Sequence, residues 1–249
     1  MKKLLALFAL VFIASCVTEP AAAPTEEVVQ GDYFKAICYH PVNVGETERS
    51  WEFLDQDLDL MQEAGINVVR VYVPIAEEEV LDKFAARGMK VITSFGYNQD
   101  SVYDLYSGTY LDYVNKYKDH PAIYLWELGN EYNYHPEWFG GDLTVWYKTL
   151  EAATDAIHAV DTNHFVTTAH GEVPDSKALH YGRNLDMWGF NVYRWDLPAS
   201  FVADWRAKSD KPFYFSELGA DSYMTIEKDS LQKGVNERAQ ALAVGHIID

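Results

Sequence analysis

Two glutamates in this sequence have the type and setting of reactive carboxylates. Glu131 ends the segment WELGNE, and Glu217 lies in FYFSEL, so each follows a short apolar run with the character of a β-strand. Two carboxylates held on separate rigid strands are the minimum equipment for cleaving a glycosidic bond. The pair therefore predicts chemistry on sugars.

The elements that must position these glutamates follow an alternating pattern. Short apolar runs alternate with helix-like segments from about residue 33 onward, without a linker, which predicts a single parallel α/β domain. No glycine-rich phosphate loop follows the first run, so a barrel is favoured over an open doubly wound sheet. The predicted strands are residues 34–39, 67–72, 90–95, 123–128, 165–169, 187–192 and 213–217.

Helical periodicity is clearest in two of the intervening segments. Apolar residues between Leu143 and Val160 recur at spacings of three and four, which gives one continuous stripe. A second helix runs through Leu54, Leu58 and Met61 and is expected to stop at Gly65, because glycine suits the left-handed position after a helix end.

The strand count falls one short of a complete barrel. After the seventh strand the sequence offers a loop and a helix-like segment at residues 237–248. We therefore predict an α/β (β/α)₈ TIM barrel whose eighth strand is missing from a chain truncated at its C-terminus. A seven-stranded or irregularly closed barrel is the alternative. Two strand edges would be left partly unpaired, which is a liability for stability.

Polar residues recur where the predicted strands end. In barrels of this kind the reactive groups lie at the C-terminal ends of the strands. So many polar groups would be costly in a structural core, where each needs a partner, and together they indicate a site. These residues are His40, Arg70, Asn98, Asn130, Glu131, His170, Glu172, Asn191, Tyr193 and Glu217.

These motifs resemble the retaining glycoside hydrolases of clan A, which include families 2, 5, 17 and 72. The resemblance rests on the Asn130-Glu131 pair after strand four, the Asn191-to-Tyr193 segment after strand six and Glu217 on strand seven. It covers nearly the whole domain, from Tyr39-His40-Pro41 to Ser216-Glu217-Leu218. The segment GINVVRVY, residues 65–72, is similar to members that act on β-1,3-glucan.

The resemblance implies roles for five residues. Glu131 would be the general acid and base and Glu217 the nucleophile, with Arg70 keeping Glu217 ionised and Tyr193 donating a hydrogen bond to it. Asn130 would hold the sugar 2-hydroxyl. A retaining mechanism predicts that the two carboxyl groups lie about 5 to 5.5 Å apart.

Other residues have two interpretations each. His40, His170 and Glu172 either shape substrate subsites or pack, and Trp138 and Trp195 are either sugar platforms or packing beneath loops. Glu127 could compete with Glu131 for the acid role, but its place inside a strand favours pairing within the barrel. We expect Cys38 to be a buried thiol.

The N-terminus has the pattern of an export signal. Two lysines precede an apolar run in residues 1–15, and Ile13 to Cys16 resembles the bacterial lipobox, in which the cysteine is lipidated. We predict a lipoprotein signal at 1–15, a flexible tether at 16–32 and the catalytic domain at 33–249, incomplete at its C-terminus. The protein would be exported and anchored through lipid on Cys16 to the outer membrane or cell surface of the bacterial envelope. An ordinary secretory signal is the alternative.

The charge of the chain limits the classes of molecule that it can bind. The formal net charge is −18, and removal of Lys2 and Lys3 with the signal leaves −20. Such a surface repels nucleic acid and anionic polysaccharides but not a neutral sugar polymer. We expect no cofactor, no protein partner and no metal, since His40 stands alone where a metal hydrolase would have clustered histidines.

The sequence thus predicts a retaining glycoside hydrolase that acts on a neutral β-linked polysaccharide or oligosaccharide, a β-glucan and in particular a β-1,3-glucan, by double displacement. Two alternatives stay open. A glucanosyltransferase would use the same covalent intermediate, and a non-catalytic lipoprotein would only bind the glycan.

Overall fold

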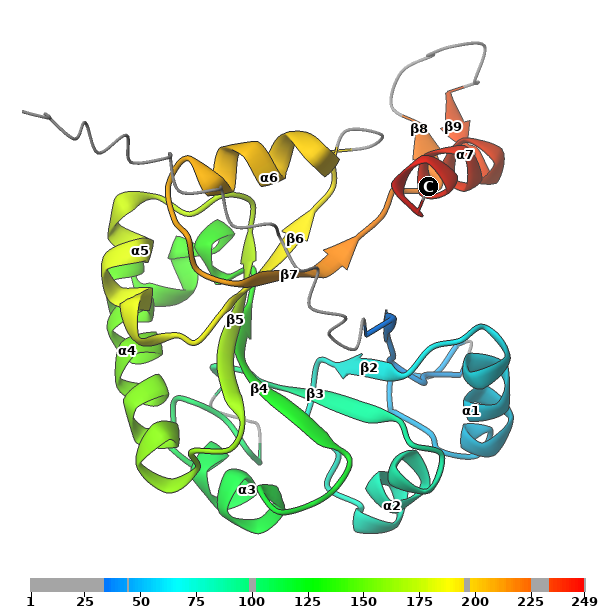
Figure 1. Cartoon of the computed structure of the whole chain (residues 1–249), viewed down its shortest axis with the longest axis horizontal. Helices are drawn as coiled ribbons and strands as arrows, with labels where there is room; N and C mark the ends of the chain where they lie inside the picture. The colour runs from blue at the N-terminus through cyan, green and yellow to red at the C-terminus, as the bar shows by residue number, and fades with distance from the viewer. Residues whose placement is uncertain (1–33, 44, 99–101, 195–197, 225–232, 249) are drawn as a thin grey trace, which may run out of the picture. The chain divides into compact units, whose positions relative to one another are not determined.

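Seven parallel strands form the scaffold of the domain. The computed structural model describes residues 34–249 except 44, 99–101, 195–197, 225–232 and 249. Each strand pairs in parallel with the next along the chain (Figure 1). The strands are β1 Ala36–Cys38, β2 Val68–Val71, β3 Lys90–Phe95, β4 Ile123–Asn130, β5 Phe165–Gly171, β6 Trp188–Val192 and β7 Phe213–Leu218.

Helices lie outside the ring of strands (Figure 1). They are α1 Leu54–Glu63, α2 Glu78–Ala86, α3 Tyr110–Tyr117, α4 Leu143–Val160, α5 Ser176–Tyr181, α6 Pro198–Arg206 and α7 Glu237–Ile248, with 3₁₀ turns η1 Tyr132–Tyr134, η2 Pro136–Phe139 and η3 Gly182–Asn184. All seven predicted strands are present, as are the predicted helices at 143–160 and 237–248. The barrel-like α/β architecture expected from the sequence is confirmed.

Local sequence explains where the helices begin and end. Asp142 caps α4 by accepting a hydrogen bond from the Thr144 backbone N at 2.8 Å. The stripe predicted on α4 is buried, with Trp146, Leu150 and Ile157 in the core. Helix α1 ends just before Gly65, whose φ of +74° is the left-handed conformation expected there.

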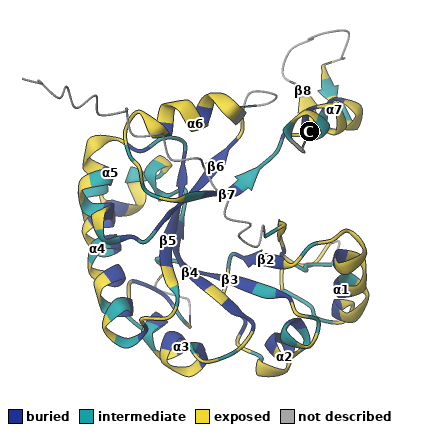
Figure 2. Cartoon of the chain, viewed as in Figure 1, coloured by how far each residue is buried: buried dark blue, intermediate teal, exposed yellow. Residues whose placement is uncertain are grey.

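Alternation along the strands divides the barrel interior into an apolar and a polar layer. Val68, Ile92 and Leu125 belong to a small buried cluster with Tyr214 and Met187. Two residues further along β2, β3 and β4, the same faces carry Arg70, Ser94 and Glu127, all of them buried. Figure 2 shows the strands from β2 to β6 largely buried and the outer faces of the helices exposed. The polar layer lies one step closer to the strand ends that carry the predicted catalytic residues.

The barrel has an open seam between β1 and β7. The described residues form a nearly closed barrel of seven strands, and β7 does not pair with β1. All three residues of β1 are exposed. Cys38 is one of them, so the expectation of a buried thiol is wrong. Its Sγ lies 3.5 Å from the Ser216 carbonyl oxygen of β7. The apolar run around Cys38 predicts burial, but no strand within the described residues covers this edge.

A short antiparallel hairpin follows β7 where the sequence predicts only a loop. It pairs β8, Tyr223–Met224, with β9, Gly234–Val235. Strands of two residues are too short to show an alternating pattern.

None of the helices within the described ranges is long and apolar enough to cross a membrane. The predicted signal, the lipidation site Cys16 and the tether all lie outside the described residues.

Candidate active site

A bulge in β4 directs the end of the WELGNE motif toward the site. The pairing of β4 with β5 shifts register between Glu127 and Asn130. Residues three apart on a regular strand face opposite sides, yet both of these side chains contact Arg70. Gly129 makes the bulge possible, because its φ is +70° and a Cβ there would lie 2.7 Å from the Trp146 ring.

Glu131 follows this bulge in a constrained backbone conformation. Its φ is 55°, and its backbone N donates to the Ala169 carbonyl oxygen at 2.8 Å. Glu172, after β5, has a φ of 59°, and these are the two non-glycine residues with positive φ in the described part of the chain. Left-handed backbone at a glutamate costs on the order of 1 kcal/mol or more, and such conformations cluster at functional sites.

A second bulge precedes the nucleophile candidate. The β6–β7 pairing shifts register between Phe190 and Asn191, so that Asn191 lies opposite Glu217. The hydroxyl of Ser216, the extra residue of this bulge, donates to Asn191 Oδ1 at 2.6 Å. Bulges of this kind re-aim side chains next to active sites. Both candidate glutamates therefore owe their direction to an irregular strand end.

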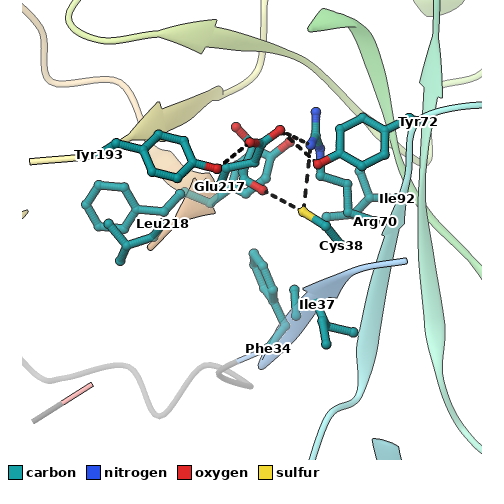
Figure 3. Close-up of a pocket in the computed structure, with 13 residues that line it drawn as sticks. Phe34, Ile37, Cys38, Arg70, Tyr72, Ile92, Tyr193, Glu217 and Leu218 are labelled. Atoms are coloured by element: carbon teal, nitrogen blue, oxygen red, sulfur yellow. Dashed lines mark hydrogen bonds and ion pairs between the residues drawn. The ribbon is translucent and has the colours of Figure 1, made fainter. Parts of the chain in front are cut away.

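Three donors hold the Glu217 carboxylate. Arg70 Nη1 and the Tyr72 hydroxyl donate to Oε1 at 2.9 and 3.0 Å, and the Tyr193 hydroxyl donates to Oε2 at 2.7 Å. Figure 3 shows the two tyrosines on either side of Glu217 with Arg70 beside it. The two contacts predicted for the nucleophile, from Arg70 and Tyr193, are both present. All three hydrogen bonds favour the ionised form of a carboxylate.

The tyrosines remain protonated donors. Burial, with the hydrogen bond to Glu217 and the charge of that carboxylate, raises the pKa of Tyr193 well above its usual value. Burial likewise raises the pKa of Tyr72. For Arg70, burial opposes the charge, but the Glu127 carboxylate outweighs it and the pKa lies above the usual value. Neutral phenols and a cationic guanidinium thus face Glu217 at every pH of interest.

Asn130 has a fixed orientation. Its Oδ1 accepts from Arg70 Nη2 at 2.8 Å and from Asn191 Nδ2 at 3.0 Å. Because two donors contact the same atom, that atom is the amide oxygen, and this assigns Oδ1 and Nδ2 of Asn130. Within the described residues, no hydrogen bond engages the Asn130 Nδ2 group, so it is available to a sugar hydroxyl.

Glu127 lies below the rim in the polar layer. Its side chain is 0% exposed and pairs with Arg70 Nη2 at 2.7 Å. A carboxyl group without access to solvent cannot protonate a substrate at the rim. The structure thus places Glu127 in the pairing role that its position in the strand suggests.

A cavity of about 570 Å³ opens beside Glu217 (Figure 3). It extends from the nucleophile side of the rim along the seam, and Glu131 is not part of its lining. Cys38 and Phe34 contribute from the β1 side, and Tyr72 and Tyr193 from the rim.

Two of the remaining predicted residues lie near the rim. His40 is exposed and meets the Tyr72 ring edge-on at 6.4 Å between ring centroids. Trp138 is 56% exposed in η2 and stacks on His135 at 3.9 Å with the ring planes 7° apart. This pre-oriented indole suits a sugar platform. Trp195 lies outside the described residues.

Glu172 is already engaged. Arg194 donates to both of its carboxylate oxygens, at 2.6 Å from Nη2 to Oε2 and 3.1 Å from Nε to Oε1. Arg194 also binds Asp204 of α6 at 2.7 Å. Glu172 therefore helps to hold Arg194, which follows β6, and any sugar contact would compete with Arg194.

His170 does not reach the rim. It is 6% exposed and packs edge-on against Trp188, which packs in turn against Trp205 of α6. The structure places it between the sheet and the helices, so the substrate-binding assignment is wrong and the packing alternative holds. His170 stands at a strand end, but its side chain follows the outward face that it shares with its neighbour Phe190.

The buried imidazole makes stability depend on pH. Burial lowers the pKa of His170 to about 4, against about 6.5 for an exposed histidine. Between these values the unfolded chain binds a proton that the folded protein excludes, so stability falls as the pH falls. We expect this histidine to remove up to about 3 kcal/mol of unfolding free energy between pH 7 and pH 4.

Urea unfolding of the wild type and His170→Phe at several pH values measures this effect. Between pH 7 and pH 4, the unfolding free energy of His170→Phe should fall less than that of the wild type, and the difference should equal the contribution of His170 given above. Parallel curves for the two proteins would show that His170 is not the responsible group.

Sequence reasoning missed two residues of the site. Tyr72 is two residues after Arg70 and directly follows β2, and this i, i+2 relation, if the extended backbone continues, would have placed it on the same face. Tyr134, in η1, lies close enough to Glu131 and Glu172 for both to raise its pKa, although burial is the larger cause. No periodicity marks a residue in a 3₁₀ turn.

Among the described residues, no group of three or more histidine, cysteine, aspartate or glutamate side chains lies close enough to hold a metal ion.

Comparison with curated proteins links the chain to enzymes that act on sugars. It is 27% identical over 188 residues to mannan endo-1,4-beta-mannosidase A of Podospora anserina, a match that covers 63% of this chain and 48% of that protein. It is 25% identical over 254 residues to the beta-glucuronidase of Felis catus, covering 89% of this chain and 38% of that protein. The sequence relatives of this chain are glycoside hydrolases. They support the expected enzyme class, an O-glycosyl hydrolase.

Comparison with solved structures supports the fold. A beta-glucuronidase from Faecalibacterium prausnitzii matches with a TM-score of 0.66 at 21% identity, covering 87% of this chain and 39% of that one. A family 2 beta-galacturonidase from Eisenbergiella tayi matches with a TM-score of 0.65 at 18% identity, covering 86% and 40%. No model of a known protein family matches the sequence. The chain spans about half the length, or less, of the curated relatives above.

Proposed function

We propose that this protein is a retaining glycoside hydrolase that acts on a neutral β-linked polysaccharide by double displacement. The observation that carries the proposal is the Glu217 carboxylate held by Arg70, Tyr72 and Tyr193. These donors fix its direction and offset its negative charge, and the carboxylate is 14% exposed in a cavity at the strand ends. A nucleophile for an anomeric carbon needs this combination of charge, fixed direction and access.

In this proposal Glu131 supplies the proton. It would protonate the leaving-group oxygen while Glu217 attacks the anomeric carbon, and then deprotonate the water that releases the sugar from Glu217. Asn130 would donate its free Nδ2 group to the sugar 2-hydroxyl, whose hydrogen bond strengthens in the transition state. Trp138 would stack on a neighbouring sugar ring.

The charges of the site favour a neutral sugar. Three of the four relatives and structural neighbours named above bear names of enzymes that act on uronic acids. A uronate is bound best beside a cation, but Arg70 and Arg194, the arginines at this site in the described part of the chain, already bind carboxylates of the protein. His170 is buried and neutral. Among the residues that the structure describes, an added carboxylate would meet Glu131, Glu172 and Glu217 with no unpaired arginine beside them.

A substrate panel tests this choice. We expect the complete gene product to cleave at least one of β-1,3-glucan, mixed-linkage glucan, β-1,4-mannan, galactan and cellulose. Its kcat/KM on an aryl β-glucuronide should be at least about 100-fold lower than on the matching neutral aryl glycoside, the size of one lost buried charge contact. The GINVVRVY segment favours a β-glucan, and the mannosidase of Podospora anserina points to β-1,4-mannan.

The same panel separates the alternatives. Larger oligosaccharides among the products would indicate a glucanosyltransferase. Binding of a glycan without turnover by any preparation would favour the non-catalytic lipoprotein, and preference for the glucuronide would contradict the neutral-sugar proposal.

We further propose that an eighth strand fills the seam in the complete gene product. This proposal rests on the cavity between β1 and β7 and on the exposure of all three β1 residues. In-frame coding sequence for an apolar strand after Asp249 would support this, and an immediate stop codon in the native gene would contradict it.

Lipid attachment at Cys16 is proposed from the sequence. Palmitate labelling in a bacterial host should mark the wild type and leave Cys16→Ser unlabelled. Equal labelling of both proteins would contradict the anchor.

A further inference from the structure

We propose that Glu127 is a positioning residue for catalysis, which sets the direction of the Arg70 guanidinium so that it serves the nucleophile and Asn130 together. This inference rests on the proposed function. It assigns a role to a buried carboxylate that does not touch the substrate.

Glu127 gathers donors from three strands. Its Oε1 accepts from Ser94 Oγ on β3 and from Arg70 Nη2 on β2, the latter at 2.7 Å. Its Oε2 accepts from the Tyr214 hydroxyl on β7 at 2.6 Å, and Arg70 Nε lies 2.9 and 3.0 Å from the two oxygens. A carboxylate with this many donors has one stable orientation.

That orientation determines how Arg70 distributes its five N–H groups. The Nε edge and one hydrogen of Nη2 face Glu127, and the other hydrogen of Nη2 reaches Asn130 Oδ1 at 2.8 Å. Nη1 reaches Glu217 at 2.9 Å and lies 3.8 Å from Cys38 Sγ. Each donor has an acceptor, so the guanidinium has no freedom to rotate without losing a contact.

Burial makes these contacts decisive. Arg70 is 1% exposed and Glu127 0%, so water cannot replace a lost partner. The negative charge of Glu127 also opposes the positive charge of Arg70. Without it, the full positive charge would act on Glu217 and hold that carboxylate more tightly as an anion. Glu127 therefore sets both the direction of Arg70 and the strength of its field.

The variant Glu127→Gln separates positioning from folding, because glutamine keeps the size and one acceptor of glutamate. We expect kcat/KM to fall about 10- to 100-fold. The acid limb of the pH profile, which reports ionisation of the nucleophile, should move to lower pH because a negative charge near Glu217 is gone. Glu127→Ala should lose more activity, and glutamine should recover part of that loss.

A double-mutant cycle tests whether Glu127 acts through Arg70. In an Arg70→Met background, adding Glu127→Gln should change kcat/KM by less than about 2-fold, because the group it positions is absent. The matched control is Asp161→Asn. Asp161 is also a buried carboxylate and accepts from Nε1 of Trp126, the residue before Glu127, but it has no contact with Arg70. Asp161→Asn should leave the acid limb of the pH profile at the pH found for the wild type.

This inference would be overturned if a folded Glu127→Gln protein kept the acid limb of the wild type, or if the losses in the double-mutant cycle were additive. In either case an inactive Glu217→Gln variant would still support the proposed function. If the wild type were inactive on every glycan, the proposed function would fail and this inference with it.

Discussion

Glu217→Gln is expected to lower kcat by about 10⁵-fold, the order found when a covalent nucleophile is removed. An amide cannot form the glycosyl ester, and it also conflicts with its neighbours. Oε1 accepts from Arg70 and Tyr72, and Oε2 accepts from Tyr193. The NH₂ group of glutamine cannot accept at either place, so at least one donor loses its partner. Initial rates on the preferred glycan measure the loss.

The matched control for this variant is Glu151→Gln on α4. Glu151 pairs with Arg183 on the outside of the barrel. The activity of Glu151→Gln should therefore stay within about 2-fold of the wild type. Retention of a tenth or more of the activity by Glu217→Gln would exclude Glu217 as the nucleophile.

Glu131→Gln is expected to lose activity in a way that depends on the leaving group. General acid catalysis contributes about 10²- to 10⁴-fold, so cleavage of the natural glycan should fall by about 10³-fold. An aryl glycoside with an acidic phenol needs no protonation, and its first step should proceed nearly unchanged. Release of the sugar would then limit turnover, so KM should fall together with kcat.

Added azide provides the control for this second variant. It can attack the glycosyl-enzyme without base assistance, so it should accelerate Glu131→Gln and yield a β-glycosyl azide. It should not accelerate the wild type. Equal losses on good and poor leaving groups, with no azide effect, would contradict the acid and base role.

Much of the scaffold can be predicted from the sequence because the parallel strands are short apolar runs, most of them buried on both faces. All seven parallel strands are predictable as short apolar runs, and α4 as a stripe of period 3.6. The proximity of Arg70 to Glu217 is predictable as well, since both stand at strand ends that meet on one rim.

The finer geometry of the site has no comparable pattern in the sequence. A bulge inserts one residue, and the apolar pattern of WELGNE looks the same with or without it, yet the β4 bulge lets Glu127 and Asn130 share Arg70. The face taken by a side chain at a strand end is equally hidden. His170 is expected at the rim from its place in the sequence, but it packs behind the sheet.

Exposure at the seam is also beyond prediction from local composition. Cys38 lies in an apolar run, and burial depends on a neighbouring strand that the pattern around it does not encode. The same open edge makes the Cys38 side of the cavity accessible next to Glu217.

The proposed mechanism depends above all on a covalent bond between Glu217 and the sugar. Mass spectrometry detects this bond in peptides from the complete gene product after inactivation with a 2-deoxy-2-fluoro glycosyl fluoride of the sugar it prefers. The fluorine slows both steps, and the good leaving group allows the first to proceed, so the intermediate accumulates. We expect one added sugar, located on Glu217 and absent from Glu217→Gln. A sugar on a different residue, or full turnover without any adduct, would contradict the mechanism.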